Sequence, residues 1–258
     1  MVQKFKKRSL PIELKGNNPR LKCEFVSTMD QYYFDRFGCF MIDSFLKNTP
    51  DNFVLHLYAE KINSKFTKTD KLKVYDWNHV CLKNWKDFCN KTENKKEVKF
   101  AKKGFAFLHA LENIKGDYII WVDADIFFKQ KIDTSFLNYA CSKKHLIGLF
   151  SHDYLNLGIS AESGFVVVNQ NHVDYKEFVK QYKVSYEQKP KEIERWYDGQ
   201  VCMYAAKQFK NVNDLSFTMY DVDTHTPLNH CPMNEFLTHE KGPTKKNLVS
   251  GYFERLIE

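Results

Sequence analysis

Two aspartates follow a short apolar run near the middle of the chain. Asp123 and Asp125 flank Ala124 directly after residues 118–122, whose β-branched and aromatic members are typical of a strand buried on both faces of a sheet. In an open α/β sheet, ligands bind at the carboxyl ends of the strands, where these carboxylates would lie. Hard cations such as Mg²⁺ or Mn²⁺ prefer oxygen ligands and often bridge a carboxylate to substrate phosphates. The pair therefore indicates a metal-diphosphate site, although Asp-x-Asp is also typical of a solvated turn.

Further polar residues punctuate the second half of the chain. Glu162, Ser163 and Gly164 precede an apolar run that ends at residue 169, and they indicate a sugar pocket in which Gly164 permits close backbone approach, or else an ordinary turn. Asp198 and Gln200 lie near the start of an expected helix, a position that also favours carboxylates for structural reasons. A last group lies close to the C-terminal end: His239, Lys241, Gly242 and Lys245.

Alternating strand-like and helix-like segments must position these residues. Strands are expected over 23–28, 53–58, 72–75, 118–122, 145–150 and 161–169, and helices over 33–47, much of 80–115, 133–141, 173–186 and 194–209. The β-α-β-β opening predicts a Rossmann-like nucleotide-binding half, with the loop after the first strand, around Thr28, against the base and ribose. Neither Gly-x-Gly-x-x-Gly nor a Walker sequence is present, which argues against a dinucleotide oxidoreductase and a P-loop enzyme.

A lysine-rich helix is expected to end just before the strand that carries the aspartates. Residues 99–111 place apolar side chains on one face, and Lys115-Gly116 is a C-terminal signal. This helix could aim Lys102 or Lys103 at a bound nucleotide sugar, although a solvated lysine face is the ordinary alternative.

Composition sets the broad class of the protein. With 258 residues and 43% hydrophobic content, the chain can form one well-cored α/β domain. Neither a membrane-spanning run nor a signal-peptide core is evident, so we expect a cytoplasmic protein. Seven scattered cysteines without Cys-x-x-Cys spacing argue against a disulfide framework and a zinc cluster. The net charge of +7 suits an anionic partner, either a nucleotide sugar or a polyanionic acceptor.

Taken together and in order, these motifs resemble the metal-dependent, nucleotide-sugar-using glycosyltransferases of the GT-A fold, with closest likeness to the glycogenin and lipopolysaccharide galactosyltransferase type. The resemblance covers most of the chain from residue 23. It implies a single domain over 23–258, with a mostly parallel sheet flanked by helices, a nucleotide-binding half (23–125) and an acceptor half (126–258). The basic residues 1–22 would form an N-terminal arm. The motifs that carry the resemblance are Asp123-Ala124-Asp125, Glu162-Ser163-Gly164 with Asn169, Asp198-Gly199-Gln200, and His239-x-x-Gly242-x-x-Lys245.

The resemblance also implies roles for these residues. Asp123, Asp125 and His239 would hold Mn²⁺ or Mg²⁺ on the diphosphate of a donor, expected to be a UDP-sugar, and a set of two carboxylates and an imidazole suits Mn²⁺. Positive charge for the leaving group and contacts to the donor would come from further residues: Thr28, Lys103, Glu162, Ser163, Gly164, Lys241, Gly242 and Lys245. An inverting enzyme would use Asp198 as general base. A retaining enzyme would place Asp198 or Gln200 beneath the anomeric carbon.

Two departures from the family pattern leave the reaction open. Lys246-Asn247 replaces the usual Pro-Trp, and Ser27 to Asp30 match the base-binding turn only loosely, so the nucleotide, the sugar and the stereochemistry are not assigned. The leading acceptor is a glycan hydroxyl. The alternatives are a hydroxylated base in DNA, suggested by the net charge and the basic residues from Lys4 to Arg8, and a non-catalytic nucleotide- or glycan-binding module. A metal-dependent nuclease ranks last because a second acidic cluster is lacking.

Overall fold

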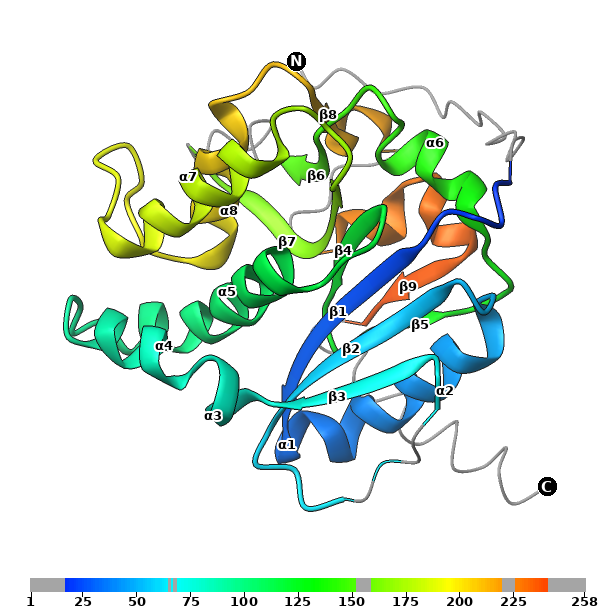
Figure 1. Cartoon of the computed structure of the whole chain (residues 1–258), viewed down its shortest axis with the longest axis horizontal. Helices are drawn as coiled ribbons and strands as arrows, with labels where there is room; N and C mark the ends of the chain where they lie inside the picture. The colour runs from blue at the N-terminus through cyan, green and yellow to red at the C-terminus, as the bar shows by residue number, and fades with distance from the viewer. Residues whose placement is uncertain (1–16, 65, 67–68, 152–158, 220–225, 241–258) are drawn as a thin grey trace, which may run out of the picture.

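A seven-stranded sheet runs through the centre of the molecule. The computed structural model describes residues 17–64, 66, 69–151, 159–219 and 226–240. The strand order is β3-β2-β1-β4-β7-β6-β8, and β7 alone runs against its neighbours (Figure 1). The strands are β1 (Cys23–Asp30), β2 (Phe53–Glu60), β3 (Leu72–Asp76), β4 (Tyr118–Val122), β6 (Ile147–Ser151), β7 (Ala161–Asn169) and β8 (Val212–Asp214). The predicted mostly parallel α/β sheet is confirmed.

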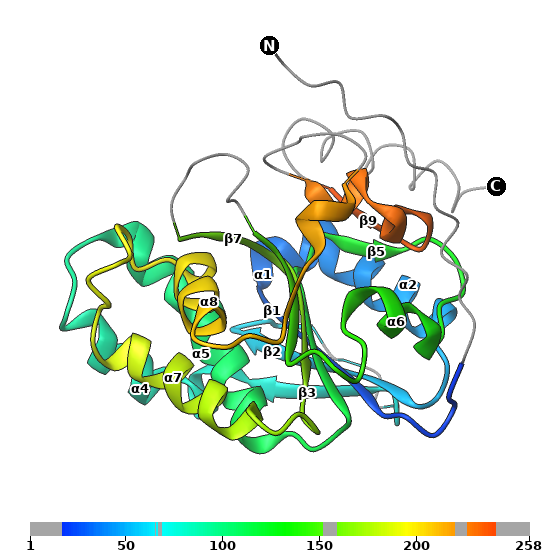
Figure 2. The same ribbon diagram turned by 90° about the horizontal axis from the view of Figure 1, so that it is seen from above.

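Helices cover the two faces of this sheet unequally. One face carries α5 (Lys95–Asn113), α7 (Tyr175–Glu187) and α8 (Asp198–Lys207), while α2 (Cys39–Asn48) and α6 (Leu137–Ala140) lie on the other (Figure 2). The sheet separates two hydrophobic cores, one on each face, and successive side chains of each inner strand point alternately into one core and the other. In β1, for example, Phe25 packs into the core beside α2 and Val26 into the core beside α5. Burial on both faces explains why the sequences of the central strands are continuous apolar runs.

The expected helices are present, with breaks that the sequence analysis did not predict. The helix expected over 33–47 is a helical run of α1 (Gln31–Tyr33), a π-helical turn (Phe34–Gly38) and α2. The Lys-rich region divides into α3 (Trp77–Val80), α4 (Leu82–Cys89) and α5. The last break lies at Asn94, whose side-chain oxygen accepts the N–H groups of Lys96 and Glu97 and so begins α5.

A small second sheet was not expected. Strand β5 (Ile126–Phe128) pairs antiparallel with β9 (Leu237–His239), and Ile126 lies opposite His239. Strands of three residues show too little alternation to stand out in a sequence. Between β8 and β9 the described chain forms short 3₁₀ turns at Leu215–Thr218, Pro227–His230 and Pro232–Glu235, and a further one, Thr134–Phe136, precedes α6.

The last residues of the expected N-terminal arm lie against the domain. The backbone N–H of Asn18 donates to Thr134 Oγ1 at 2.7 Å, and that of Lys22 donates to Asp117 Oδ2 at 2.7 Å. Residues 1–16 lie outside the described part of the chain, so the division into an arm and two halves stays a prediction. Among the described helices, none has the length and apolar content that crossing a membrane requires.

The burial of the seven cysteine thiols reports on the packing of the domain. All are free thiols; Cys39 is exposed, Cys89 is half-buried, and the other five are buried. Burial raises the pKa of Cys81, Cys141 and Cys202 to about 12, which keeps these thiols neutral and poorly nucleophilic.

We therefore predict that a thiol reagent such as Ellman's reagent labels one cysteine of the native protein rapidly at pH 8, Cys39, and the buried five only on unfolding. Cys39→Ser should remove the fast phase and leave the slow phases unchanged. Rapid labelling of three or more thiols in the native protein would contradict the packing described.

Candidate active site

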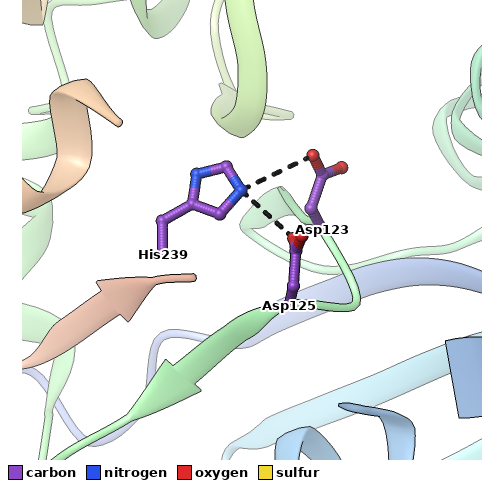
Figure 3. Close-up of side chains that lie close together, drawn as sticks. All are labelled: Asp123, Asp125 and His239. Atoms are coloured by element: carbon purple, nitrogen blue, oxygen red, sulfur yellow. Dashed lines mark hydrogen bonds and ion pairs between the residues drawn. The ribbon is translucent and has the colours of Figure 1, made fainter. Parts of the chain in front are cut away.

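Three potential metal ligands meet at the carboxyl end of β4. The Nε2 atom of His239 lies 3.1 Å from Asp125 Oδ1 and 4.0 Å from Asp123 Oδ2, and ligand atoms of the three residues all lie within 4.8 Å of one another (Figure 3). Asp125 and His239 are buried, whereas Asp123 is half-buried and so reachable from solvent. The sequence analysis expected His239 to approach Asp125 from the C-terminal segment, and the structure brings these side chains together.

The β5–β9 pairing carries His239 to the aspartates. Ile126 is the register partner of His239, and the N–H of Glu240 donates to the carbonyl of Asp125 at 2.9 Å. The side chain of Asn229 holds the backbone of His239 on its other side. Its Oδ1 accepts the His239 N–H and its Nδ2 donates to the His239 carbonyl, both at 2.7 Å. The amide of Asn229 thus makes the two backbone hydrogen bonds to His239 that a neighbouring strand would otherwise make.

Gly164 gives the imidazole its space. A Cβ atom at this position would lie 2.6 Å from His239 Cε1, closer than atoms of folded proteins approach a Cβ, and in tight contact with Glu162 Oε1 at 3.0 Å. The residue that the sequence assigned to a sugar pocket therefore also lets β7 pass directly beside the histidine.

The carboxylate of Asp123 is held in one orientation. Its Oδ1 accepts from Lys103 Nζ at 2.6 Å and from Trp121 Nε1 at 2.8 Å, and its own N–H donates to the carbonyl of Gly164. With Oδ1 engaged in this way, Oδ2 is the oxygen that faces His239. The indole of Trp121 projects from β4 beneath the carboxylate, a role that its place in an apolar run did not reveal.

Lys103 joins Asp123 to a second carboxylate. Its ammonium group lies 3.3 Å from Asp198 Oδ2 and donates to the carbonyl of Ser163 at 2.7 Å, while the hydroxyl of Ser163 donates to Asp198 at 2.6 Å. Burial alone would lower the pKa of Lys103, but the charges of Asp123 and Asp198 outweigh it and raise the pKa above its usual value. The lysine is therefore permanently charged in this cluster.

Helix α8 delivers Asp198 to the cluster with its first residue. Gly199, the next residue, packs against β7, where a Cβ would lie 2.3 Å from the carbonyl oxygen of Ala161. This contact requires a glycine and fixes the start of the helix beside Ser163.

The other predicted site residues have more varied positions. Glu162 Oε1 accepts the N–H of Gly164 at 2.9 Å, and the hydroxyl of Thr28 donates to the carbonyl of Tyr58 at 2.9 Å, at the end of β1. Gln200 Oε1 accepts the N–H of Arg195 at 2.7 Å, so this side chain braces the loop before α8. Lys241, Gly242 and Lys245 lie outside the described residues, and their roles stay predictions.

Asn229 is the main site residue that the sequence analysis missed. It lies in a polar stretch without periodicity, ten residues before the histidine that it supports. The signal that could have identified it is weak, because an asparagine in a turn is ordinary. Lys102, considered beside Lys103, instead forms an ion pair with Glu60.

The three ligand groups fit a divalent cation. Two carboxylates and one imidazole form a donor set that suits Mn²⁺, and Mg²⁺ can bind the same site through the carboxylate oxygens. Asp123 and Asp198 share the ammonium group of Lys103, and Asp125 adds a third carboxylate to the cluster. The predicted role of Asp123, Asp125 and His239 as metal ligands is thus chemically sound and open to direct test.

We expect Asp125→Ala and His239→Ala each to weaken Mn²⁺ binding at least tenfold, because each removes one of the three ligands. Isothermal titration with MnCl₂ measures the change. His172→Ala is the matched control, since His172 pairs with Asp174 outside this cluster at 3.6 Å. Unchanged Mn²⁺ affinity in both ligand variants would exclude a cation at this position.

Asn229→Ala should weaken Mn²⁺ binding about 10-fold to 100-fold, the usual effect of removing a group that orients a metal ligand. The control is Asn213→Ala, because the Asn213 amide also binds backbone carbonyls, those of Tyr139 and Ala140 at 2.7 and 3.1 Å, but away from the cluster. Both variants should lose about 1–3 kcal/mol of unfolding free energy. Equal Mn²⁺ affinity in the two would show that Asn229 acts on stability alone.

Comparison with known proteins supports the fold. No protein-family model matches the sequence, and no curated protein matches it. Among solved structures, an active-site mutant of LgtC is 13% identical, with a TM-score of 0.54 over 85% of this chain and 88% of that one. The galactosyltransferase LgtC in complex with donor and acceptor sugar analogs is 12% identical, with a TM-score of 0.50 over 85% and 87%.

A third similar structure belongs to a longer protein. The bifunctional glycosyltransferase WbbM in its apo form is 12% identical, with a TM-score of 0.50 over 77% of this chain. The chain spans 39% of the length of WbbM. At such low identities the likeness concerns the fold, and the chain has the GT-A fold that these glycosyltransferases share.

Proposed function

We propose that the protein is a metal-dependent glycosyltransferase that moves a sugar from a nucleotide-sugar donor to a hydroxyl group of a glycan acceptor. The observation that carries the proposal is the position of the Asp123–Asp125–His239 cluster. It lies at the carboxyl end of a central strand, where α/β folds bind ligands, and it adjoins the Lys103–Asp198 pair. The fold is that of solved glycosyltransferases, one of them a complex with donor and acceptor sugar analogs.

Asp123, Asp125 and His239 are the proposed ligands of Mn²⁺ or Mg²⁺. When bound, the cation would supply Lewis-acid stabilisation of the negative charge that develops on the departing diphosphate. Lys103 holds Asp123 in place and carries a fixed positive charge beside it. Lys241, Gly242 and Lys245 are proposed to contact the diphosphate, and Thr28, at the end of β1, the nucleoside.

The donor sugar would lie next to the metal ligands, alongside Lys103 and Asp198. Glu162, Ser163 and Gly164 border this space on β7, and Ser163 fixes the Asp198 carboxylate through its hydroxyl. Asp198 is the stronger of the two catalytic candidates, because the amide oxygen of Gln200 is engaged by the backbone of Arg195. An inverting reaction would use Asp198 as the base that receives the acceptor proton; a retaining one would use its charge beneath the anomeric carbon.

A UDP-sugar is the donor that we propose, on the motif likeness to the glycogenin and lipopolysaccharide galactosyltransferase type. Seven free cysteines suit a reducing compartment such as the cytoplasm, which is the location that we propose. A hydroxylated base in DNA is the alternative acceptor.

The proposal predicts Mn²⁺-stimulated hydrolysis of at least one nucleotide sugar, and faster consumption when a suitable acceptor is present. Asp198→Asn should lower the rate about 10²-fold to 10⁴-fold, because it removes the charge while keeping the shape. Asp174→Asn, which changes a carboxylate paired with His172 outside the cluster, is the matched control. Release of nucleoside diphosphate from a panel of UDP-, GDP- and ADP-sugars measures the effect.

Tight Mn²⁺-dependent binding of a nucleotide without turnover of any donor would instead favour a binding module. Transfer to duplex DNA carrying hydroxymethylated bases, but to no glycan, would identify DNA as the acceptor. Such an acceptor would also bind in a salt-dependent way, because phosphate contacts release counterions.

A further inference from the structure

An exposed aromatic pair lies next to the charged cluster. Phe100 on α5 and Tyr197, the residue before α8, have ring centroids 5.0 Å apart with planes inclined at 51°. Phe100 is 40% exposed and Tyr197 is half-buried. The guanidinium carbon of Arg195 lies 5.8 Å from the Tyr197 ring centroid. Phe100, Tyr197 and Arg195 are called the aromatic platform below.

Two pairs of side chains bridge α5 and the start of α8: an inner charged pair, and an outer aromatic pair that belongs to the platform. Phe100 precedes Lys103 by three residues, about one turn of α5, and Tyr197 directly precedes Asp198. Lys103 and Asp198 meet at 3.3 Å in the inner, charged pair, and Phe100 and Tyr197 meet in the outer, aromatic pair. The side chains of Lys103 and Asp198 are 16% and 8% exposed, whereas Tyr197 is half-buried and Phe100 is 40% exposed. The platform therefore borders the proposed reaction site on its solvent side.

Core packing does not account for this exposure. On the same helix, Phe105 and Phe107 are buried, as is Trp196 beside Tyr197. Phe100 and Tyr197 instead place two aromatic rings beside a polar site, the combination of aromatic lining and a few polar groups that ligand sites use. The amide of Gln200 adds support, because it fixes the backbone of Arg195, the polar member of the platform.

We propose that the aromatic platform binds a pyranose ring of the acceptor. A pyranose presents C–H groups on one face and hydroxyl groups around its rim. The electron-rich face of an aromatic ring attracts the C–H groups, and a guanidinium donates hydrogen bonds to the hydroxyl oxygens. The platform offers both beside Asp198. This inference rests on the proposed function and specifies the acceptor as a glycan.

The two parts of the donor are less suitable occupants. The nucleoside is expected at the end of β1, whereas Gly199, two residues after Tyr197, packs against β7, which lies beyond β4 from β1. The donor sugar must remain with the diphosphate, inside the space bordered by Ser163 and Asp198. Phe100 and Tyr197 adjoin Lys103 and Asp198 along α5 and α8, and Phe100 is exposed, so an acceptor can reach the platform from solvent.

Binding of methyl α- and β-pyranosides of glucose, galactose and mannose tests the proposal. Saturation-transfer NMR with UDP and Mg²⁺ present should show transfer to the ring C–H protons of at least one of these probes. Phe100→Ala and Tyr197→Ala should each weaken its binding about fivefold to tenfold. Tyr197→Phe, which keeps the ring, should stay within twofold of the unmodified protein.

Two further variants serve as controls. Val184→Ala removes a side chain of matched exposure, 38%, from α7, and Tyr32→Ala removes an aromatic ring from α1 that is 56% exposed. Neither should alter pyranoside binding. Affinity for UDP with Mg²⁺ should be unchanged in Phe100→Ala and Tyr197→Ala, which checks that the charged cluster remains intact.

Three results would overturn the platform: no saturation transfer to any pyranoside, equal binding by the alanine variants, or a parallel loss of UDP affinity, which would place the nucleotide there.

Donor hydrolysis by water is measured separately, so that a failure of the platform can be told apart from a failure of the proposed function. Pyranoside binding that depends on Phe100, without hydrolysis of any donor, would reject the transferase and leave a glycan-binding site. Hydrolysis without pyranoside binding would reject the platform alone.

Discussion

One ammonium group holds together carboxylates that would otherwise repel each other. Lys103 on α5 binds Asp123 after β4 and lies beside Asp198 at the start of α8, while the carbonyl of Ser163 on β7 accepts from the same nitrogen. Four elements of the domain thus converge on one charge. A buried charge is tolerated only when it is paired, so the packing of α5 and α8 against the sheet and the arrangement of the acids depend on each other.

His239, on the other side of the cluster, is positioned by a different kind of interaction. Backbone pairing with β5 and the amide of Asn229 position the backbone of His239, a missing side chain at Gly164 makes the space, and the imidazole then meets Asp125 Oδ1 at 3.1 Å. The charged half is therefore fixed by electrostatics and the histidine half by backbone hydrogen bonds and fit. A cation is the group that would connect the two.

Much of this arrangement could be predicted from the sequence, and the reasons are physical. Apolar runs such as 118–122 mark central strands because both of their faces are buried, and the acids after them mark the ligand-binding end of the sheet. The pairing of β5 with β9 could not be predicted, because strands of three residues have no measurable periodicity. Nor could the contacts of Asn229 and Trp121, which depend on side-chain directions set by tertiary structure rather than on residue type.

The partnership of Asp125 and His239 spans 114 residues of sequence. A cation shared by the two would act as a reversible cross-link that closes this long segment of the domain into a single loop. Closing a long loop costs chain entropy that must be offset by the bonds formed, so this junction should be among the last to be made during folding. An ion that binds only the folded chain adds stability by mass action, about 2.7 kcal/mol at a hundred times its dissociation constant, so such a cation would stabilise the junction between β4 and β9 together with the whole fold.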